Sequence, residues 1–443
     1  MMARNLLLCF ILVPCLVNCS LAGEPSFEGR MINDSSDYYN REFIRYENYV
    51  YSPNIRTVQC HQLGVVLSPA IVRLNSEDVL LLSFDDLEAD VKTYQYRMIH
   101  CSFDWKPSNL FESQYQHGYS SYPISDWQFS FNVIHRFTHY QLKFPNNEIK
   151  PAISGNYLLI IFQDDQKDQP VITRRFMVVD QKVGIETNVH QATVIDDRRS
   201  KQEVDFSILK NGYNIENAFD DLKVAIYQND RTDNVITNLK PLFLNGNNLE
   251  YDYEEGNVFN GGNEFRYFDM RSLRTPSERI RQIISESDTV HVFLMDDLKR
   301  SSNRYSSASD INGAYVIKTY DGTTDQIESD YCLVHFRLPI QTPFSEGNLY
   351  VFGSFTDWSF NKQTRMIYNA NNQSYECVLF LKQGYYNYEY VLMEDGSGLA
   401  NETEIEGNHW ETENTYMICV YNKASNKNYD ELIGVKRVST FTH

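Results

Sequence analysis

Short runs in which apolar and polar residues alternate, each ended by a turn signal, recur along this chain. In Tyr140–Phe144 the apolar residues alternate with Gln141 and Lys143, and Pro145-Asn146-Asn147 follows as a turn. A period of two puts the apolar side chains on one face of a strand. Comparable runs in the first third are Ile55–His61, Val79–Phe84, Tyr94–His100, Trp127–Phe131, Tyr157–Gln163 and Val171–Val179. Their length and spacing predict a β-sandwich.

The pattern resumes after Asp180 and again after Asp330, with polar Thr319–Ser329 between the two stretches. The 31 Tyr and 26 Phe of the chain favour strands, and Ala is too scarce for an all-helical fold. We therefore predict an all-β protein of three consecutive immunoglobulin-like β-sandwich domains. The expected divisions are a signal peptide at 1–22, an N-terminal extension at 23–52, and sandwiches at 53–181, 182–328 and 329–436.

The N-terminus is typical of an export signal. Arg4 supplies the positive charge, Leu6–Val17 is a short apolar run, and Ser20-Leu21-Ala22 is a small-x-small cleavage site. The alternative is a lipid anchor on Cys19, although Asn18 is large and polar for the position before a lipidated cysteine. The formal net charge of −19 and the missing basic footprint exclude a nucleic-acid binder. Membrane association is expected only through a partner or that anchor.

Beyond the leader, the cysteines are widely spaced and form no CxxC pair, which excludes a zinc ribbon or a thioredoxin-like site. Buried thiols are the expected state, with a Cys377–Cys419 bridge left open. These cysteines are Cys60, Cys101, Cys332, Cys377 and Cys419.

Motifs for chemistry are missing from the sequence. The acidic run Asp85–Asp90 begins like a calcium loop, but no Gly follows Asp90, and Arg97 stands where the bidentate Glu is needed. No GxSxG, HExxH or P-loop motif occurs. We predict no catalytic residues, no metal site, no cofactor and no enzyme activity.

The last third resembles the glycogen-binding (E-set) type of immunoglobulin-like module. The resemblance is carried by Val351–Trp358, Gly384–Val391 and Asp395-Gly396. It implies that Trp358 stacks on sugar and that Asn414 hydrogen-bonds it. Glu389 stands where such modules carry a lysine, so the fold carries over better than the ligand.

The segment Gly261–Arg274 is a basic, aromatic island in an acidic chain. Arginine and aromatic residues are enriched at interface hot spots, which predicts a docking role. The alternative is that the arginines stabilise the fold by pairing with buried acids such as Asp269. The predicted docking residues are Arg266, Tyr267, Phe268, Arg271 and Arg274.

Marks spread over the whole chain resemble the plug protein family of the bacterial type IX secretion system. They are Leu80–Leu87, Ile99–Trp105, Ser154–Tyr157, Thr173–Val178, Asn257–Asp269, Asp310–Val316 and Ile405–Glu413. The resemblance implies a non-catalytic periplasmic protein on the inner side of the outer membrane. Its partner would be the very large outer-membrane translocon barrel, whose periplasmic opening it seals when idle. The alternative function is a periplasmic or surface carbohydrate-binding protein that uses the last module.

Overall fold

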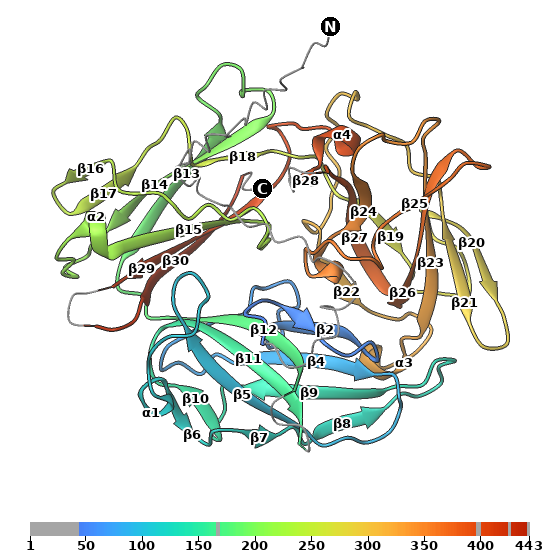
Figure 1. The fold of residues 1–443 in the computed structure, drawn as a ribbon, viewed down its shortest axis with the longest axis horizontal. Coiled ribbons are helices and arrows are strands. Elements are labelled where there is room, and N and C mark those ends of the chain that lie inside the picture. The colour runs from blue at the N-terminus through green and yellow to red at the C-terminus, as the bar shows by residue number, and fades with distance from the viewer. Residues whose placement is uncertain (1–43, 165–168, 396–399, 424–426, 441–443) are drawn as a thin grey trace, which may run out of the picture.

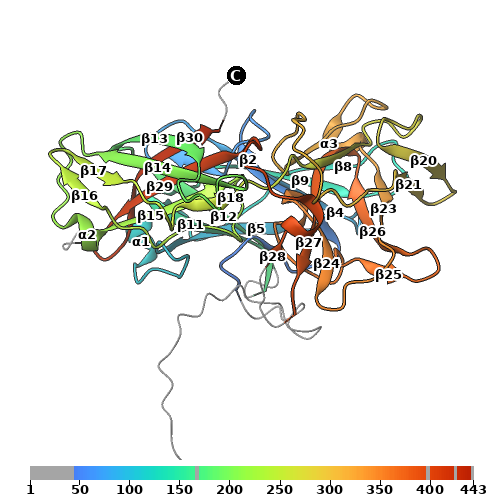
Figure 2. The same ribbon diagram turned by 90° about the horizontal axis from the view of Figure 1, so that it is seen from above.

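Three β units surround a common centre in the computed structural model of this chain (Figure 1). The structure describes residues 44–164, 169–395, 400–423 and 427–440. The expected signal peptide, Cys19 and most of the 23–52 extension lie outside these residues. Seen from above, the units form a flattened body (Figure 2). No helix among the described residues has the length and apolarity needed to cross a membrane.

The first unit packs two main sheets face to face. The alternating residues Leu80, Leu82 and Phe84 of one sheet and Leu159 and Ile161 of the other share one core, in which all are almost fully buried. One sheet has the order β1 (Tyr49–Val50), β12 (Pro170–Val179), β11 (Gly155–Gln163), β5 (Tyr94–Cys101) and β7 (Tyr122–Pro123), and β3 (Ile71–Arg73) pairs with β12. The other has the order β2 (Ile55–Gln62), β4 (Leu80–Asp86), β9 (Thr138–Phe144) and β8 (Asp126–Phe129). A side ribbon joins β6 (Gln116–Gly118) to β10 (Ile149–Pro151), next to α1 (Glu112–Tyr115).

The second unit is also a two-sheet sandwich. Val204, Phe206 and Ile208 of one sheet face Ile226 and Ile418 of the other in a shared core. One sheet contains β13 (Gly184–Gln191), β14 (Lys201–Leu209), β17 (Asn248–Tyr251) and β16 (Phe243–Asn245), with β18 (Val258–Asn260) beside β14. The other contains β15 (Leu222–Gln228), β29 (Thr415–Asn422) and β30 (Glu431–Ser439), and α2 (Ala218–Asp221) precedes β15.

The third unit encloses an aromatic-rich core, in which the Phe268 and Tyr386 rings stack with centroids 5.0 Å apart. One sheet is centred on β27 (Gly384–Met393), which pairs with β19 (Arg266–Asp269), β22 (Tyr315–Ile317), β24 (Asn348–Phe352) and β28 (Ala400–Asn401). The other has the order β20 (Ile280–Ser285), β21 (Val290–Leu294), β23 (Tyr331–Pro339), β26 (Ser374–Lys382) and β25 (Ile367–Asn369). Short helices are α3 (Asp325–Glu328), the 3-10 turn η1 (Ser354–Thr356) and α4 (Thr403–Glu406).

The second and third units are interleaved, which differs from the expected division at residues 328 and 329. β15 pairs along its whole length with β29, although these strands lie on opposite sides of that boundary. β19 likewise pairs with β27, and β21 pairs with β23. The chain therefore leaves the second unit after β18, builds the third, and returns for β29 and β30. The alternation of side chains along a strand specifies which residues face the core. It does not specify which strand pairs with it, because backbone hydrogen bonds are the same for every neighbour.

The cysteines among the described residues are free, and Cys60 is half-buried. Cys101, Cys332, Cys377 and Cys419 are buried, and burial raises the pKa of the Cys377 thiol to about 12. Cys377 belongs to β26 of the third unit and Cys419 to β29 of the second. The bridge that the sequence left open between them is therefore not formed.

A buried imidazole makes the first unit sensitive to acid. Burial lowers the pKa of His100 to about 4, from an ordinary value of 6.5. Unfolded chains take up this proton near pH 6.5, so the stabilisation is complete above that pH and is lost as the pH falls toward 4. We expect His100 to cost about 2 kcal/mol of unfolding free energy at pH 5 relative to pH 7.5. Urea unfolding at pH 7.5 and at pH 5 measures this difference in unfolding free energy. If the His100→Phe variant loses as much stability at pH 5 as the wild type does, His100 is not its cause.

Candidate docking surface

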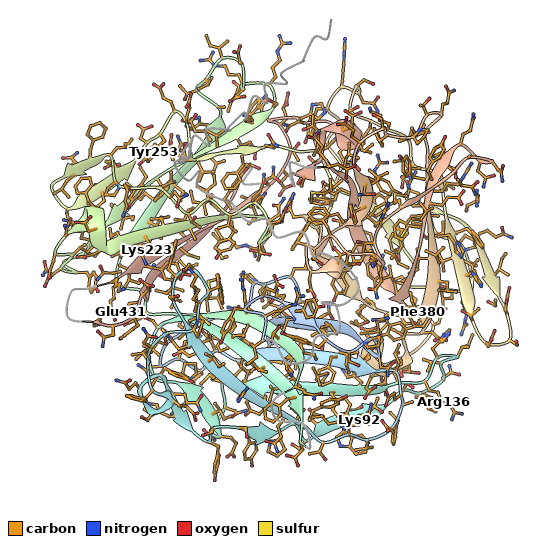
Figure 3. All side chains as sticks on the ribbon, viewed as in Figure 1. Lys92, Arg136, Lys223, Tyr253, Phe380 and Glu431 are labelled. Carbon is orange, nitrogen blue, oxygen red and sulfur yellow. The ribbon has the colours of Figure 1, made fainter. Side chains whose placement is uncertain are left out.

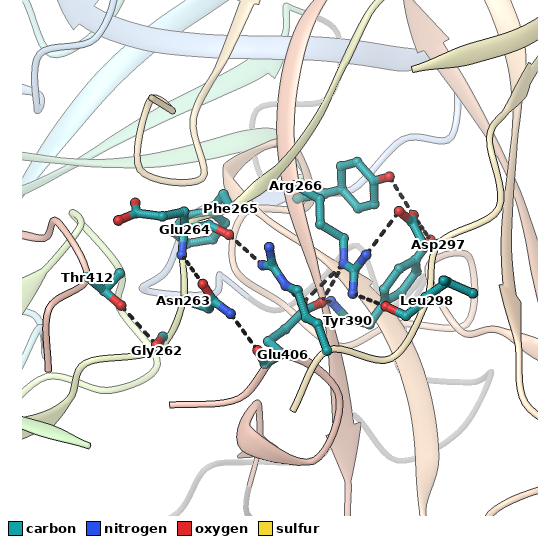
Figure 4. Close-up of polar contacts among 12 residues, drawn as sticks. Gly262, Asn263, Glu264, Phe265, Arg266, Asp297, Leu298, Tyr390, Glu406 and Thr412 are labelled. Carbon is teal, nitrogen blue, oxygen red and sulfur yellow. Dashed lines mark hydrogen bonds and ion pairs between the residues drawn. The ribbon is translucent and has the colours of Figure 1, made fainter. Parts of the chain in front are cut away.

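The basic, aromatic segment Gly261–Arg274 begins with two glycines, Gly261 and Gly262. They lie where the chain passes from the second unit to the third. A Cβ atom on Gly261 would lie 2.0 Å from the His409 carbonyl oxygen, so only glycine fits there. Gly262 has a φ of 69°, and its carbonyl oxygen accepts hydrogen bonds from the His409 amide (2.8 Å) and the Thr412 hydroxyl (3.0 Å; Figure 4). The chain that leaves the second unit at Gly261–Gly262 is therefore bonded to the chain that returns to it at His409–Thr412.

Arg266 lies inside the third unit, where its side chain is 9% exposed. The guanidinium bonds to Asp297 (3.0 Å), to Glu406 (3.0 Å) and to the Leu298 carbonyl oxygen (2.8 Å; Figure 4). Burial by itself would raise the pKa of Glu406, but Arg266 and Arg300 hold it below its ordinary value. Arg266 therefore stabilises the fold, which is the second of the two roles that the sequence left open.

Phe268 is fully buried and belongs to the core of the third unit. It is two residues from Arg266 and therefore shares the inward face of β19. Neither residue presents a surface to a partner in this structure.

Other side chains of the segment reach the surface beside Tyr320. Together they form an arginine–tyrosine patch, which we define as Tyr267, Arg271, Arg274 and Tyr320. Arg271 bonds to Asp269 (2.9 Å), and its guanidinium lies 4.7 Å from the centre of the Tyr320 ring. The Arg274 side chain is 76% exposed, with Asp321 at 3.3 Å, and Tyr320 is 59% exposed. This patch combines an exposed guanidinium, that of Arg274, with an aromatic ring that contacts Arg271.

Trp358 is buried, so it does not offer a platform for sugar. Its ring packs edge-on against Phe352 and Phe265, with centroids 5.3 and 6.0 Å away, and the Arg231 guanidinium lies 5.2 Å from its centre. Its burial matches an aromatic residue at a strand end that packs on the core.

Asn414 is also buried and its side chain is fully used. It donates to the Gly261 carbonyl oxygen (2.8 Å) and to Gln202 (3.0 Å), and it accepts from Asn229 (2.7 Å). The geometry of Trp358 and Asn414 therefore lends no support to a carbohydrate site.

Edge strand β8 is an exposed aromatic surface that the sequence interpretation missed. It closes one side of the sheet β2-β4-β9-β8, and all four of its residues are exposed. Trp127 and Phe129 contact each other edge-on (5.3 Å), and Phe131 just beyond is 66% exposed. The aromatic alternation of this run indicated a core-facing strand; only its edge position leaves the rings uncovered.

The three units also line a partly open pocket of about 720 Å³. The Arg174 guanidinium of the first unit spans to Asp357 of the third (3.1 Å) at its wall. This pocket could not be predicted from the sequence, because the residues that line it come from distant segments of the chain. They include Arg174, Arg175, Tyr227, Tyr315, Trp358 and Arg437.

Comparisons with known proteins match a family model to the first unit and a solved structure to most of the chain. A family model described as the first domain of the type 9 secretion system plug protein matches residues 55–180. The crystal structure of a hypothetical protein from Parabacteroides merdae ATCC 43184 is 32% identical, with a TM-score of 0.86. That match covers 90% of this chain and 100% of that one.

The remaining comparisons add nothing to the fold. No curated protein matches the chain. A Pseudomonas fluorescens DNA glycosylase (9% identity, 28% of this chain and 30% of that one) has a TM-score of 0.17. An Escherichia coli alpha-2-macroglobulin fragment (9% identity, 47% and 99%) has the same score, and scores this low carry no structural argument. The matched first unit and the full-length structural relative together show that the chain belongs to the type 9 secretion system plug protein family.

Proposed function

We propose that this protein is the non-catalytic periplasmic plug that binds the outer-membrane translocon barrel of the type IX secretion system. It seals the periplasmic opening of that barrel when no cargo is loaded. Family membership is the observation that carries the proposal; it indicates a part in this secretion system and a cell-envelope location. The export signal expected at residues 1–22 supports a periplasmic site.

The packing of the units fits a role that needs a preformed body. An apolar cluster containing Met177 and Val179 of the first unit and Met417 and Tyr421 of the second joins these two units. Beside it, Asp430 of the second unit accepts a hydrogen bond from the Phe103 amide of the first (2.9 Å) and pairs with Lys223 (3.1 Å), which Figure 3 labels. A body that is already rigid loses little conformational entropy when it docks, which favours binding.

The arginine–tyrosine patch is the proposed contact with the barrel. Of its two arginines, Arg274 is the sharper probe, because Arg271 is held by Asp269 and Tyr320. Reversal at Arg274 changes a charge that is mainly in solvent and leaves the buried core intact. Exposed aromatic and arginine side chains of this kind can each contribute more than 1 kcal/mol to binding.

We expect Arg274→Glu to lower recovery of the barrel about tenfold in affinity pulldowns from the native host, with an unchanged melting temperature. Arg304→Glu, at another exposed arginine of the same unit, is the matched control and should retain full recovery. Phe129→Ser tests edge strand β8.

The outcomes separate the function from its surface. Failure of the wild-type protein to recover the barrel in controlled pulldowns would refute the plug function. Equal recovery by Arg274→Glu and Arg304→Glu would refute the patch alone, and a loss confined to Phe129→Ser would move the contact to β8.

A further inference from the structure

Three potential metal ligands meet on the outer face of the second unit. His190 of β13 is the cross-strand neighbour of Glu203 of β14, and Asp205 is two residues further along β14. The intervening Val204 and the following Phe206 face the core, so Glu203 and Asp205 share the opposite face. Nε2 of His190 lies 2.7 Å from an Asp205 oxygen and 3.9 Å from a Glu203 oxygen.

The hydrogen bonds of His190 require a proton or a cation between its Nε2 and Asp205. Its Nδ1 lies 2.7 Å from the Gln191 carbonyl oxygen, which can only accept, so Nδ1 carries a proton. Nε2 then faces the Asp205 carboxylate, which is also an acceptor. A bare lone pair there would be repelled. A proton, carried by Nε2 or by Asp205, or a cation must therefore lie between these two atoms.

Both carboxylates are held in place by neighbouring donors. The Thr193 amide donates to one Glu203 oxygen (2.7 Å), and its hydroxyl donates to the other (3.2 Å). The Asn257 amide donates to Asp205 (2.9 Å). The Gln191 carbonyl oxygen likewise accepts from His190 Nδ1. Each potential ligand therefore has a hydrogen-bond partner that orients it, which is the usual arrangement around protein metal sites.

The charge at this cluster is not balanced by the protein. The Glu203 side chain is 1% exposed and that of Asp205 is 15% exposed. Among the residues that the structure describes, His190 is the only ion-pair partner of either carboxylate. A protonated His190 would still leave one negative charge, whereas a divalent cation would neutralise both. Buried carboxylates are costly unless they are paired or bind a metal.

We propose that His190, Glu203 and Asp205 bind one zinc ion, with a fourth position open to water on the half-exposed His190 side. The three donor atoms lie within 4.8 Å of one another. Tetrahedral zinc with bonds of about 2.0–2.1 Å needs donors about 3.3 Å apart, so small side-chain shifts suffice. The imidazole ligand favours zinc over calcium and magnesium, which prefer oxygen ligands only.

The site would strengthen the junction between the second and third units. Thr193 opens the loop that leads back to β14, and this loop contacts both crossings of the chain. The Ser200 carbonyl accepts from the Gly261 amide (2.8 Å), and the Arg199 carbonyl accepts from the Trp410 amide (3.2 Å). Zinc that ties β13 to β14 beneath this loop would hold the two crossings together.

Zinc titration of the tag-free, chelator-treated full chain tests the proposal by calorimetry and thermal unfolding. We expect one zinc ion per chain and a rise of a few degrees in melting temperature, because the ligand binds the folded state alone. His190→Ala should weaken zinc binding at least tenfold. Asp205→Asn is the second variant, since it preserves shape and removes one charge.

Two histidine variants are the controls. His117→Ala removes an exposed histidine from β6 and should bind as the wild type does. His335→Ala removes the partner of His291, whose Nδ1 lies 2.9 Å from His335 Nε2, the rival histidine pair. The proposal is overturned if wild type binds no zinc, if both His190→Ala and Asp205→Asn bind like wild type, or if only His335→Ala loses binding.

Discussion

Arg266→Met is expected to lower the free energy of unfolding by about 3 kcal/mol, because it leaves two buried carboxylates without their shared cation. Asp297 and Glu406 are each 1% exposed at the side chain. Loss of a buried partner costs about 3–5 kcal/mol in general. The lower figure applies here, because Arg279 still pairs with Asp297 (2.8 Å) and Arg300 still contacts Glu406 (2.6 Å).

Chemical unfolding followed by tyrosine fluorescence measures this loss. Arg274→Met is the matched control: it removes the same charge, five residues beyond the end of β19, from a side chain that is 76% exposed. It should change the unfolding free energy by less than about 0.5 kcal/mol. A similar small change in Arg266→Met would show that Arg266 is not what holds this part of the third unit.

Lys382→Met is expected to cost about 3–5 kcal/mol and to loosen the contact between the first and third units. Lys382 at the end of β26 reaches Asp85 on β4 (2.6 Å), and both side chains are 1% exposed. Asp85 also accepts from His139 (2.6 Å) and from the Tyr331 hydroxyl (2.7 Å). Figure 3 shows Phe380 of the same strand on this side of the third unit, facing the first.

The pH dependence gives this prediction a distinctive signature. Burial tends to raise the pKa of Asp85, but Lys382 and His139 hold it below its ordinary value. The stabilisation is therefore present above the unfolded pKa and lost as the pH falls through the folded one. Without Lys382, burial raises the Asp85 pKa, so the carboxyl can take up a proton at mildly acidic pH.

The stability gap between wild type and Lys382→Met should therefore narrow as the pH is lowered from 7.5 toward 4.5. Urea unfolding over this range measures it, and Asp85→Asn with Lys382→Met should recover part of the loss, because no charge stays buried. A gap that is constant with pH, with no recovery in the double variant, would contradict the ion-pair explanation. Hydrogen exchange at β4 and β26 reports the loosening.

The strands themselves were predictable from local pattern. The run Tyr140–Phe144 is the end of β9, and Tyr331–Leu338 is nearly all of β23. Period-two alternation arises from the geometry of a single strand, so it needs no knowledge of the neighbours. β13 and β30 were missed, because polar residues such as Thr187 and Lys436 stand where alternation calls for apolar ones.

The candidate docking surface and the proposed zinc site were predictable only in part. The basic, aromatic character of Gly261–Arg274 marked the segment, but the separation of buried Arg266 from exposed Arg274 depends on Asp297 and Glu406, which are distant in sequence. His190 and Glu203 gave no motif, since ligands on neighbouring strands have no characteristic spacing along the chain.

The sequence by itself determined the β class, most strands and the plug-family resemblance, because alternation, turn residues and motif order are properties of neighbouring positions. The tertiary structure alone decided the interleaving of the second and third units, the burial of Trp358 and the meeting of Lys382 with Asp85. These depend on backbone pairing and burial between residues far apart in the chain, which local preferences do not specify.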